Sequence, residues 1–192
     1  MIYSIAGKLA IKSEHFVVVE IAGIGFKIFI NKGNAKSLPA PRADIKLFCY
    51  LNVKEDGMEL YGFPSEDELR FFEMLNSVSG VGPKSALAIL AISELKNLSA
   101  AIKENRPDLL TRASGIGRKT AERIILELKT KVQAERSESV VRKMESDADL
   151  TETLVGLGYR REEAKAALSK VDEKVVKMED RLKTALKILG RK

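Results

Sequence analysis

Two short glycine-rich segments hold the residues best suited to bind a charged ligand. The sequence Ser-Gly-Val-Gly-Pro-Lys-Ser-Ala at 79–86 returns 35 residues later as Ser-Gly-Ile-Gly-Arg-Lys-Thr-Ala at 114–121. When the comparison is extended to thirteen positions, the two copies are identical at six. Self-similarity at a fixed spacing indicates a repeated supersecondary unit. Each copy predicts a helix, a short Gly-x-Gly hairpin and a second helix.

The residue types in this unit favour the binding of phosphate. Glycine allows positive φ and lets a backbone approach a ligand closely. The lysine and the hydroxyl residue that follow lie in the first turn of the second helix, whose free N–H groups attract an anion. This arrangement suits a phosphate of a nucleic-acid backbone, contacted without reading the bases. The candidate binding residues are Gly80, Gly82, Lys84, Ser85, Gly115, Gly117, Arg118, Lys119 and Thr120.

Two other interpretations of the glycines need to be weighed. A Gly-x-Gly segment can simply turn the chain between packed helices, but a turn does not require the same lysine at the same offset twice. A Walker-type loop places lysine directly after its last glycine and follows a strand. Here Pro83 and Arg118 intervene, and a helix is expected before each hairpin. ATP binding is therefore not predicted.

Composition argues against catalysis and for a soluble chain. Of 192 residues, 45% are hydrophobic and 31% charged, and the net charge of +6 is spread along the chain without a basic tail. The single histidine, His15, and the single cysteine, Cys49, cannot build a catalytic triad or a zinc site. We expect no metal and no cofactor. Cys49 is predicted to be a buried thiol in a reducing compartment.

The first 63 residues predict five strands without an intervening helix. These are rich in β-branched and aromatic residues, and Asp56-Gly57 is a turn signal between the last two. Five such strands predict a small closed barrel, with the OB fold as the leading candidate. The expected strands are Ile2–Ile11, Phe16–Ile21, Gly25–Ile30, Ile45–Val53 and Met58–Phe63, with Phe26, Phe29 and Phe48 in the core.

The middle of the chain contains several residues typical of helix starts. Ser65 to Glu68 forms a capping-box pattern, Ser93 is the expected cap of a helix ending at Lys103, and Pro107 begins the helix that enters the second hairpin. The segment 86–92 is apolar on all sides and is predicted to be buried. The segment 120–131 interleaves charged and apolar residues, so one face of the helix predicted there should be exposed to solvent.

The last third of the chain predicts a charged linker followed by a small bundle. Residues 135–147 contain few apolar residues and no aromatic ones, which favours a mobile linker. Three short amphipathic segments follow, at 150–157, 162–171 and 175–189. A bundle this small has marginal stability by itself. Its apolar residues could therefore either pack in its core or contact a partner protein.

These features together resemble the RuvA family. The resemblance rests on Leu60-Tyr61-Gly62-Phe63-Pro64 at the end of the barrel, the paired hairpins, and Leu157-Gly158-Tyr159. It covers essentially the whole chain. We predict a multi-domain α+β protein with an N-terminal OB-fold β-barrel, a central all-α tandem helix-hairpin-helix domain, a flexible linker and a C-terminal three-helix, UBA-like bundle. The predicted boundaries are 1–64, 65–134, 135–146 and 147–192.

The resemblance implies a non-catalytic subunit that binds four-way (Holliday) junctions. In this family an acidic pin enters the junction centre, and Glu55 and Asp56 match it, although by themselves they are an ordinary solvated turn. Matching positions for docking a RuvB-type AAA+ ATPase are Leu154, Leu157, Tyr159 and Leu186, which core packing would explain equally well.

The resemblance also implies how the protein assembles and where it acts. The family forms a homotetramer, or two tetramers face to face as an octamer, with a RuvC-type resolvase as a further partner. Met1-Ile2-Tyr3 leads directly into strand-like sequence and no apolar run approaches the length of a membrane span, so we expect a cytoplasmic protein. The resemblance implies that it is bacterial and nucleoid-associated. Two rivals remain: a helix-hairpin-helix repair enzyme, such as a glycosylase or nuclease, and a module that binds only proteins.

Overall fold

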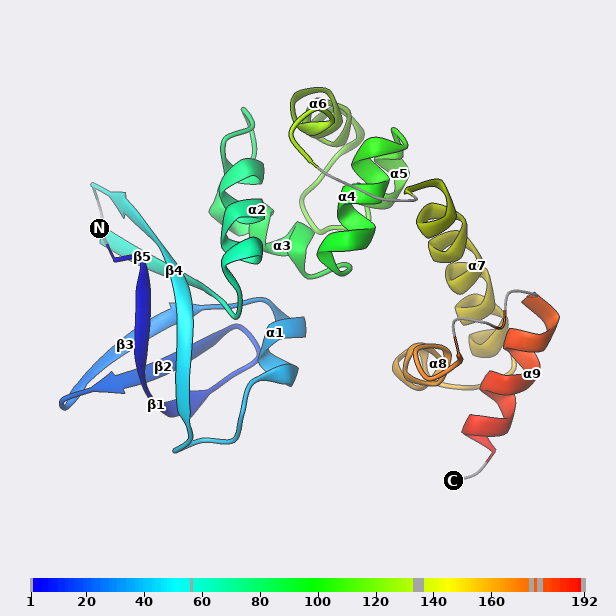
Figure 1. Ribbon diagram of the computed structural model, residues 1–192, viewed down its shortest axis with the longest axis horizontal. Helices are drawn as coiled ribbons and strands as arrows, with labels where there is room; N and C mark the ends of the chain where they lie inside the picture. The colour runs from blue at the N-terminus through cyan, green and yellow to red at the C-terminus, as the bar shows by residue number, and fades with distance from the viewer. Residues whose placement is uncertain (1, 56, 133–136, 173–174, 176–177, 191–192) are drawn as a thin grey trace. The chain divides into compact units, whose positions relative to one another are not determined.

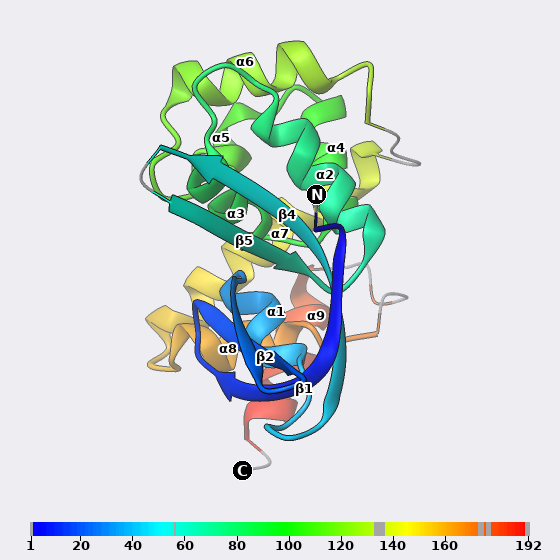
Figure 2. The same cartoon turned by 90° about the vertical axis from the view of Figure 1, so that its left-hand side faces the viewer.

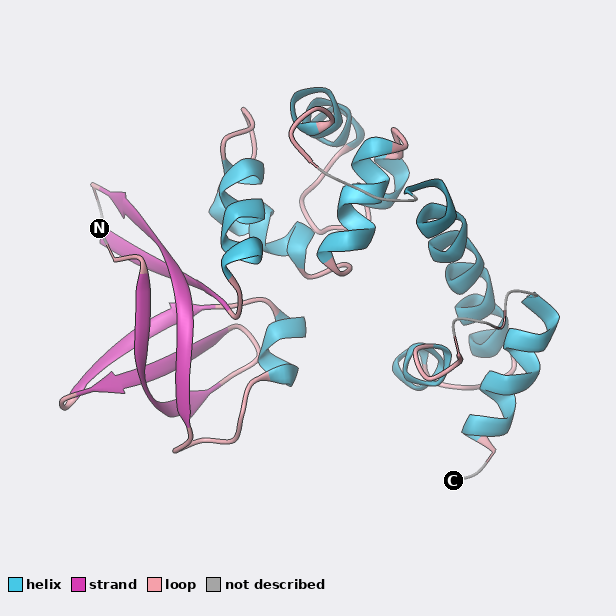
Figure 3. Cartoon of the chain, in the orientation of Figure 1, coloured by secondary structure: helices cyan, strands magenta, loops and turns pink. Residues whose placement is uncertain are grey.

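The chain folds into two compact units, Met1–Ser137 and Glu138–Lys192. The computed structural model describes residues 2–55, 57–132, 137–172, 175 and 178–190, with backbone only for 137–145. In the first unit a barrel is followed by a helical region, and the second unit is helical (Figure 1). All the described strands belong to the barrel (Figure 3).

The barrel closes in the order β1-β2-β3-β5-β4. Its strands are β1 (Ser4–Lys12), β2 (Phe16–Ile21), β3 (Ile24–Phe29), β4 (Asp44–Lys54) and β5 (Gly57–Phe63). All neighbours are antiparallel except β3 and β5. The prediction of a five-stranded OB-like barrel is confirmed.

The sequence did not predict one helix that connects two strands of the barrel. Helix α1 (Lys32–Ser37) connects β3 to β4 and begins where Asn31 Oδ1 accepts a hydrogen bond from the Asn34 backbone N–H at 2.7 Å. Asparagine is among the best residues at a helix N-cap. The signal was therefore present, but six residues between two apolar strands were too few to show helical periodicity.

Alternating strand residues fill the barrel interior. Val17 and Val19 on β2, and Ile5 and Leu9 on β1, are fully or nearly fully buried, as the period of two requires. Cys49 lies among them, and burial raises the pKa of its thiol to about 11, so that it stays protonated at neutral pH. The prediction of a buried cysteine is confirmed.

The predicted core phenylalanines are only partly inside. Phe26 packs half-buried against the barrel core, while Phe29 and Phe48 pack half-buried against the core of the helical region. Gly62 is needed for close packing, because a Cβ there would lie 2.5 Å from Ile28 Cγ2.

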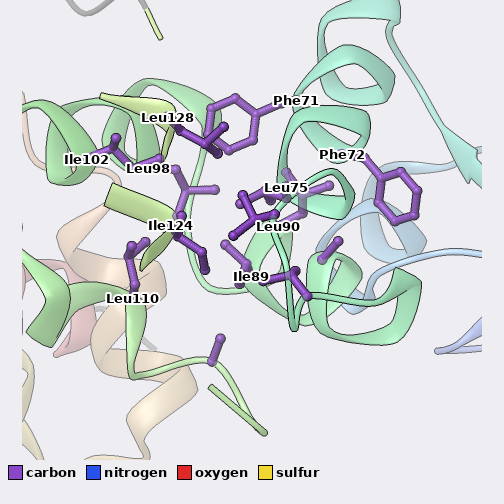
Figure 4. Close-up of a cluster of buried hydrophobic side chains, with 14 of the residues drawn as sticks. Phe71, Phe72, Leu75, Ile89, Leu90, Leu98, Ile102, Leu110, Ile124 and Leu128 are labelled. Atoms are coloured by element: carbon purple, nitrogen blue, oxygen red, sulfur yellow. The ribbon is translucent and has the colours of Figure 1, made fainter. Parts of the chain in front are cut away.

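Outside the barrel, the described residues of the first unit form five helices around one core. They are α2 (Glu66–Asn76), α3 (Pro83–Leu90), α4 (Leu95–Lys103), α5 (Pro107–Leu110) and α6 (Arg118–Leu128). Figure 4 shows Leu75, Ile89, Leu110 and Ile124 meeting in this core. Tyr61 and Phe63 of β5 belong to the same core, so the barrel and helices are packed as one body. The boundary expected at residue 64 stays a prediction.

The helix caps agree in part with the sequence. Ser65 Oγ accepts from the Glu68 backbone N–H at 3.2 Å, while the Glu68 carboxylate accepts from Asn34 Nδ2 at 2.7 Å and so ties α2 to α1. Pro107 begins α5, as predicted. The expectation that Ser93 caps α4 is wrong by one residue, because Glu94 holds the N-cap position.

Helix α3 is less buried than its composition predicts. Leu87 and Ala88 are half-buried, and Ala91, just beyond its end, is exposed. An apolar helix is buried only where other elements cover it, and α3 is covered on one side alone.

The described residues from the end of the first unit onward form three helices: α7 (Ser137–Gly156), α8 (Arg161–Leu168) and α9 (Met178–Leu189). They enclose a small apolar core that includes Leu150, Leu154 and Leu168. The Arg181 guanidinium of α9 is buried and pairs with the Asp147 carboxylate of α7 at 2.5 Å. The three-helix prediction is confirmed.

The backbone of α7 occupies much of the stretch predicted to be a linker. Helix begins at Ser137, within the range 135–146 expected to be flexible. The reason is visible in the sequence, since the stretch lacks glycine and proline and nothing interrupts a helix there. Low hydrophobicity is evidence against a buried helix but not against an exposed one.

No single helix among the described residues is long and apolar enough to cross a membrane. The combination α3 with α4 reaches the required length and composition, but the two helices meet at a bend of 103°.

Candidate nucleic-acid interface

Each of the two Gly-x-Gly segments forms a hairpin, and the two hairpins have the same conformation. In the first, the Val81 N–H donates to the Val78 carbonyl at 3.0 Å; in the second, the Ile116 N–H donates to Ala113 at 3.2 Å. All four of these residues are buried, so each hairpin is anchored to the core from its inner side. The repeat seen in the sequence is therefore a repeat in three dimensions.

The two glycines of each hairpin have different roles. Gly80 and Gly115 adopt φ of +86° and +80°, a left-handed conformation that glycine adopts without steric cost. Gly82 and Gly117 have φ of −89° and −82°, which any residue can adopt. A Cβ at either of these would meet nothing within 4 Å. Neither conformation nor packing within the described residues requires glycine at this second position.

Both hairpins present a helix N-terminus to solvent. Gly82 and Gly117 are the N-caps of α3 and α6, and neither has a side-chain cap. Lys84 and Lys119 are exposed in the first turns, next to the half-buried hydroxyl residues Ser85 and Thr120. Uncapped N–H groups, a partial positive charge and a lysine at one place form a suitable site for an anion.

The hairpins differ at their first helical residue. Pro83 begins α3, where its missing N–H costs nothing. Arg118 begins α6, and its Nε lies 2.9 Å from a carboxylate oxygen of Glu122 one turn along. Both side chains are exposed, so the pair contributes at most about 1 kcal/mol and can yield to another anion.

The sequence analysis missed one residue that links the two hairpins. Arg123 of α6 donates a hydrogen bond from Nη1 to the Ser79 carbonyl of the first hairpin at 3.0 Å. Ala88 occupies the matching position of the first copy. A charged residue that breaks the repeat was the available signal, but its partner lies 44 positions away and only the fold brings the two together.

The β4–β5 hairpin forms an arm beyond the barrel (Figure 2). Strand β4 pairs with β1 only as far as Phe48, and β3 pairs with β5 at Leu60 and Tyr61. Farther out, the described residues of β4 and β5 pair with each other, ending at Lys54 and Gly57. Glu55 is exposed at the tip, and Asp56 lies outside the described residues. The arm thus holds at least one carboxylate away from the barrel core.

The four candidate docking residues of the second unit have different environments. Leu154 is fully buried in the bundle core, whereas Leu157 keeps 59% of its surface exposed. Tyr159 and Leu186 are half-buried against the core. Helix α7 ends at Gly156, and Gly158 turns the chain at a φ of +95°, so Leu157 leaves the helix face that holds Leu154.

The described residues offer little for catalysis. They contain no group of three or more His, Cys, Asp or Glu side chains placed to hold a metal ion. A surface hollow of about 560 Å³ beside the second hairpin includes Asp108 and Glu122. Arg106 donates two hydrogen bonds to Asp108, which lowers the pKa of that carboxyl, and Glu122 pairs with Arg118. A carboxyl whose pKa is lowered by arginine, as that of Asp108 is, is poorly suited to act as a general acid.

Three family models match successive parts of the chain. The RuvA N terminal domain matches residues 1–62, a SAM-like helix-hairpin-helix tandem matches 72–130, and the RuvA C-terminal domain matches 147–190.

Curated relatives match over nearly the full length. The chain is 45% identical to a protein of Caldanaerobacter subterraneus, with all of both chains covered. It is 42% identical to one of Thermoanaerobacter sp. strain X514, covering 98% of this chain and 99% of the relative. This chain belongs to the RuvA family. A member from Chlorobaculum parvum is 37% identical over 94% of both chains. These relatives are named Holliday junction branch migration complex subunit RuvA.

The hairpin lysines generate a first prediction. Lys84→Ala and Lys119→Ala should each weaken DNA binding to a similar degree on every sequence, because phosphate contacts do not read bases. Each should also flatten the slope of log K against log salt by about 0.9, the value for one phosphate neutralised. Gel-shift titrations at several salt concentrations measure both quantities.

Lys129→Ala is the matched control, since it removes the same charge at the other end of α6, about 15 Å away at 1.5 Å per residue. A double variant of Lys84 and Lys119 with the salt slope of the unaltered protein would contradict the phosphate role.

The two glycines of the second hairpin give a second prediction. Gly117→Ser should keep or slightly raise stability, because serine is a good N-cap and the site is open. It should nevertheless weaken DNA binding, because the side chain takes the space beside the bare N–H groups. Gly115→Ala should instead cost about 1–2 kcal/mol of unfolding free energy through its positive φ.

Thermal unfolding and gel shifts on the same samples separate the two effects. A Gly117→Ser protein that binds DNA as well as the unaltered chain would show that no ligand approaches this residue closely.

Proposed function

We propose that this protein is the DNA-binding subunit of a branch-migration complex and that it binds four-way junctions. The observation that carries the proposal is the pair of equivalent hairpins in one packed body, each with an uncapped helix N-terminus and an exposed lysine. The names of its relatives, which specify Holliday junction branch migration, support the same function.

The hairpins bind the phosphates of the DNA backbone. Phosphate oxygens accept hydrogen bonds from the N–H groups at the starts of α3 and α6, and Lys84 and Lys119 add positive charge. Gly82 and Gly117 let the strand come close to those N–H groups. Ser85 and Thr120 are placed to donate hydroxyl hydrogen bonds, and Arg118 reaches phosphate when it leaves Glu122. These contacts fix the position of a duplex without selecting its sequence.

The arm supplies repulsion instead of attraction. Glu55, with Asp56 next to it in the sequence, is an acidic pin at the tip of the β4–β5 hairpin. At separations below about 8 Å, the Debye length at physiological salt, repulsion between carboxylates and phosphates is not fully screened. An intact duplex is then disfavoured at the arm, whereas a junction, whose strands separate at the centre, accommodates it.

The second unit serves the motor. Leu157 is the strongest candidate for docking a RuvB-type AAA+ ATPase, because it is apolar and exposed. Tyr159 and Leu186, which are half-buried against the bundle core, are further candidates. Leu154 contributes to the fold of the bundle. The working assembly is a homotetramer or octamer that matches a four-armed substrate, with a RuvC-type resolvase as a further partner, in the bacterial cytoplasm at the nucleoid.

Junction preference tests the proposal directly. In gel-shift competition the protein should prefer a four-way junction to a linear duplex of equal length. Glu55→Gln with Asp56→Asn should bind junctions at least as tightly and discriminate less against duplex, because removing repulsive charges cannot weaken attraction. Asp44→Asn is the control, at the opposite end of β4, roughly 30 Å away at 3.3 Å per residue.

Equal affinity of the unaltered protein for junction and duplex would refute the proposed function. Weaker junction binding by the neutralised arm, with unchanged preference over duplex, would refute the pin alone.

The docking patch gives a further prediction. Leu157→Glu should change unfolding free energy by no more than about 0.5 kcal/mol, because the side chain is exposed, yet abolish stimulation of the motor ATPase. Leu154→Ala, at a fully buried site, should cost about 2–5 kcal/mol and loosen the bundle. Hydrogen exchange of the α8 and α9 amides in the full chain distinguishes the two. Unchanged ATPase stimulation by Leu157→Glu would exclude that residue from the docking surface.

A further inference from the structure

The second copy of the repeat contains two arginines that the first copy lacks. Arg118 and Arg123 lie in α6, and the matching positions of α3 hold Pro83 and Ala88. At these positions the sequence gives both additional cations to the second copy. If both arginines served the second hairpin, that hairpin would hold a bound DNA backbone more strongly than the first.

The fold divides the two arginines between the hairpins. Arg118 stays at the second hairpin, where it follows the N-cap residue Gly117. Arg123 lies five residues farther along α6, and its Nη1 donates a hydrogen bond to the Ser79 carbonyl of the first hairpin at 3.0 Å. The same nitrogen lies 3.7 Å from the position that a Cβ on Gly80 would occupy. The Arg123 guanidinium therefore lies against the backbone of the first hairpin.

The charge of Arg123 is available to a ligand. Its side chain is exposed, and no ion pair to it is present in the part of the chain that the structure describes. Arg118, in contrast, pairs with Glu122 at 2.9 Å. A guanidinium has five N–H donors, and the hydrogen bond to Ser79 uses one of them. The remaining donors suit phosphate, whose oxygens arginine can bind two at a time.

The hydrogen bond to Ser79 also prepares the first hairpin for an anion. Ser79 and Gly80 are both exposed, and Gly80 has the left-handed φ that turns the chain. An exposed carbonyl oxygen carries partial negative charge and repels a phosphate that comes close to it. A hydrogen bond from a cation offsets that charge and holds the carbonyl in one orientation. Arg123 thus removes a repulsive group from the place where it adds an attractive one.

We propose that Arg123 is a DNA-binding residue of the first hairpin, although it belongs to the helix that starts at the second. The inference rests on the proposed function, because it requires the hairpins to bind phosphate. Each hairpin then presents one lysine and one arginine, which are Lys84 with Arg123 at the first and Lys119 with Arg118 at the second. The phosphate site of the first hairpin is complete only when the two copies of the repeat are packed together.

A purely structural role for Arg123 predicts a different result. If the guanidinium only holds the Ser79 carbonyl in place, its replacement weakens DNA binding without changing the salt dependence, because no phosphate loses a cation. If it contacts phosphate, its replacement also releases one counterion fewer on binding. The slope of log K against log salt therefore separates the two roles.

Salt titrations of the full chain with a four-way junction as probe test the inference. Arg123→Gln should weaken binding about ten-fold at low salt, the order expected for the loss of one hydrogen bond to a charged group. It should also flatten the salt slope by about 0.9, the value for one phosphate no longer neutralised. Arg123→Lys keeps the charge but not the planar group, so it should recover the slope and only part of the affinity.

Double variants show which hairpin Arg123 serves. Groups that act at one site are coupled, whereas groups at separate sites contribute independently. Arg123→Gln combined with Lys84→Ala should therefore reduce affinity by less than the product of the two single reductions. Arg123→Gln combined with Lys119→Ala should reduce it by the full product.

Arg70→Gln is the matched control. Arg70 is an exposed arginine in the first half of α2, and it pairs with Glu66 of the same helix at 3.2 Å. The change removes the same charge from the first unit and should leave the salt slope unaltered. Thermal unfolding shows whether all variants are folded.

Two results would overturn the inference. One is an Arg123→Gln protein with the salt slope of the unaltered chain, whatever its affinity. The other is coupling of Arg123 to Lys119 with independence from Lys84, which would assign the arginine to the second hairpin. If the lysine variants flatten the slope and Arg123→Gln does not, only the inference fails. If none of the three changes the slope, the hairpins do not bind phosphate and the proposed function fails as well.

Discussion

The packing of one phenylalanine joins the parts of the first unit. The Phe72 ring on α2 is completely buried, and the rings of Tyr50, Tyr61 and Phe63 lie 5.2, 5.6 and 4.8 Å from it. Aromatic pairs of this kind contribute about 0.5–1.5 kcal/mol each beyond the burial of their surface. Because α2 leads into the first hairpin and the other three rings belong to β4 and β5, this cluster sets where the hairpin lies relative to the acidic arm. The relative placement of hairpin and arm therefore depends on the packing of uncharged aromatic rings.

The tandem repeat is symmetric in its backbone and asymmetric in its chemistry. Both hairpins have the same left-handed glycine, the same uncapped helix start and the same lysine. One difference is that Arg123 stands in the second copy where Ala88 stands in the first, and its hydrogen bond to Ser79 joins the two copies directly. Buried residues of both hairpins, including Val81 and Ile116, also belong to one core, which holds the two copies together.

Charge in this protein acts through its position rather than its total. A net charge of +6 spread over 192 residues attracts DNA weakly and without preference. In the function proposed above, attraction is concentrated at two helix starts, and repulsion is concentrated on the arm that extends from the barrel. A preference for one DNA shape over another would then arise from the difference between the two, since a ligand that fits avoids the repulsive groups and one that does not fit meets them.

Local patterns in the sequence were sufficient for much of this description. Alternating apolar residues gave the five strands, and the repeated Gly-x-Gly-x-Lys gave two hairpins with their lysines, because turn conformation and helix starts depend on neighbouring residues. Contacts between distant residues decided the rest. Leu154 and Leu157 are three positions apart and equally apolar, yet only packing against α8 and α9 and the turn at Gly158 make one core and the other surface. In the same way, Arg123 appears in the sequence as an ordinary charged residue. Its partner, Ser79, comes within reach only after the chain has folded.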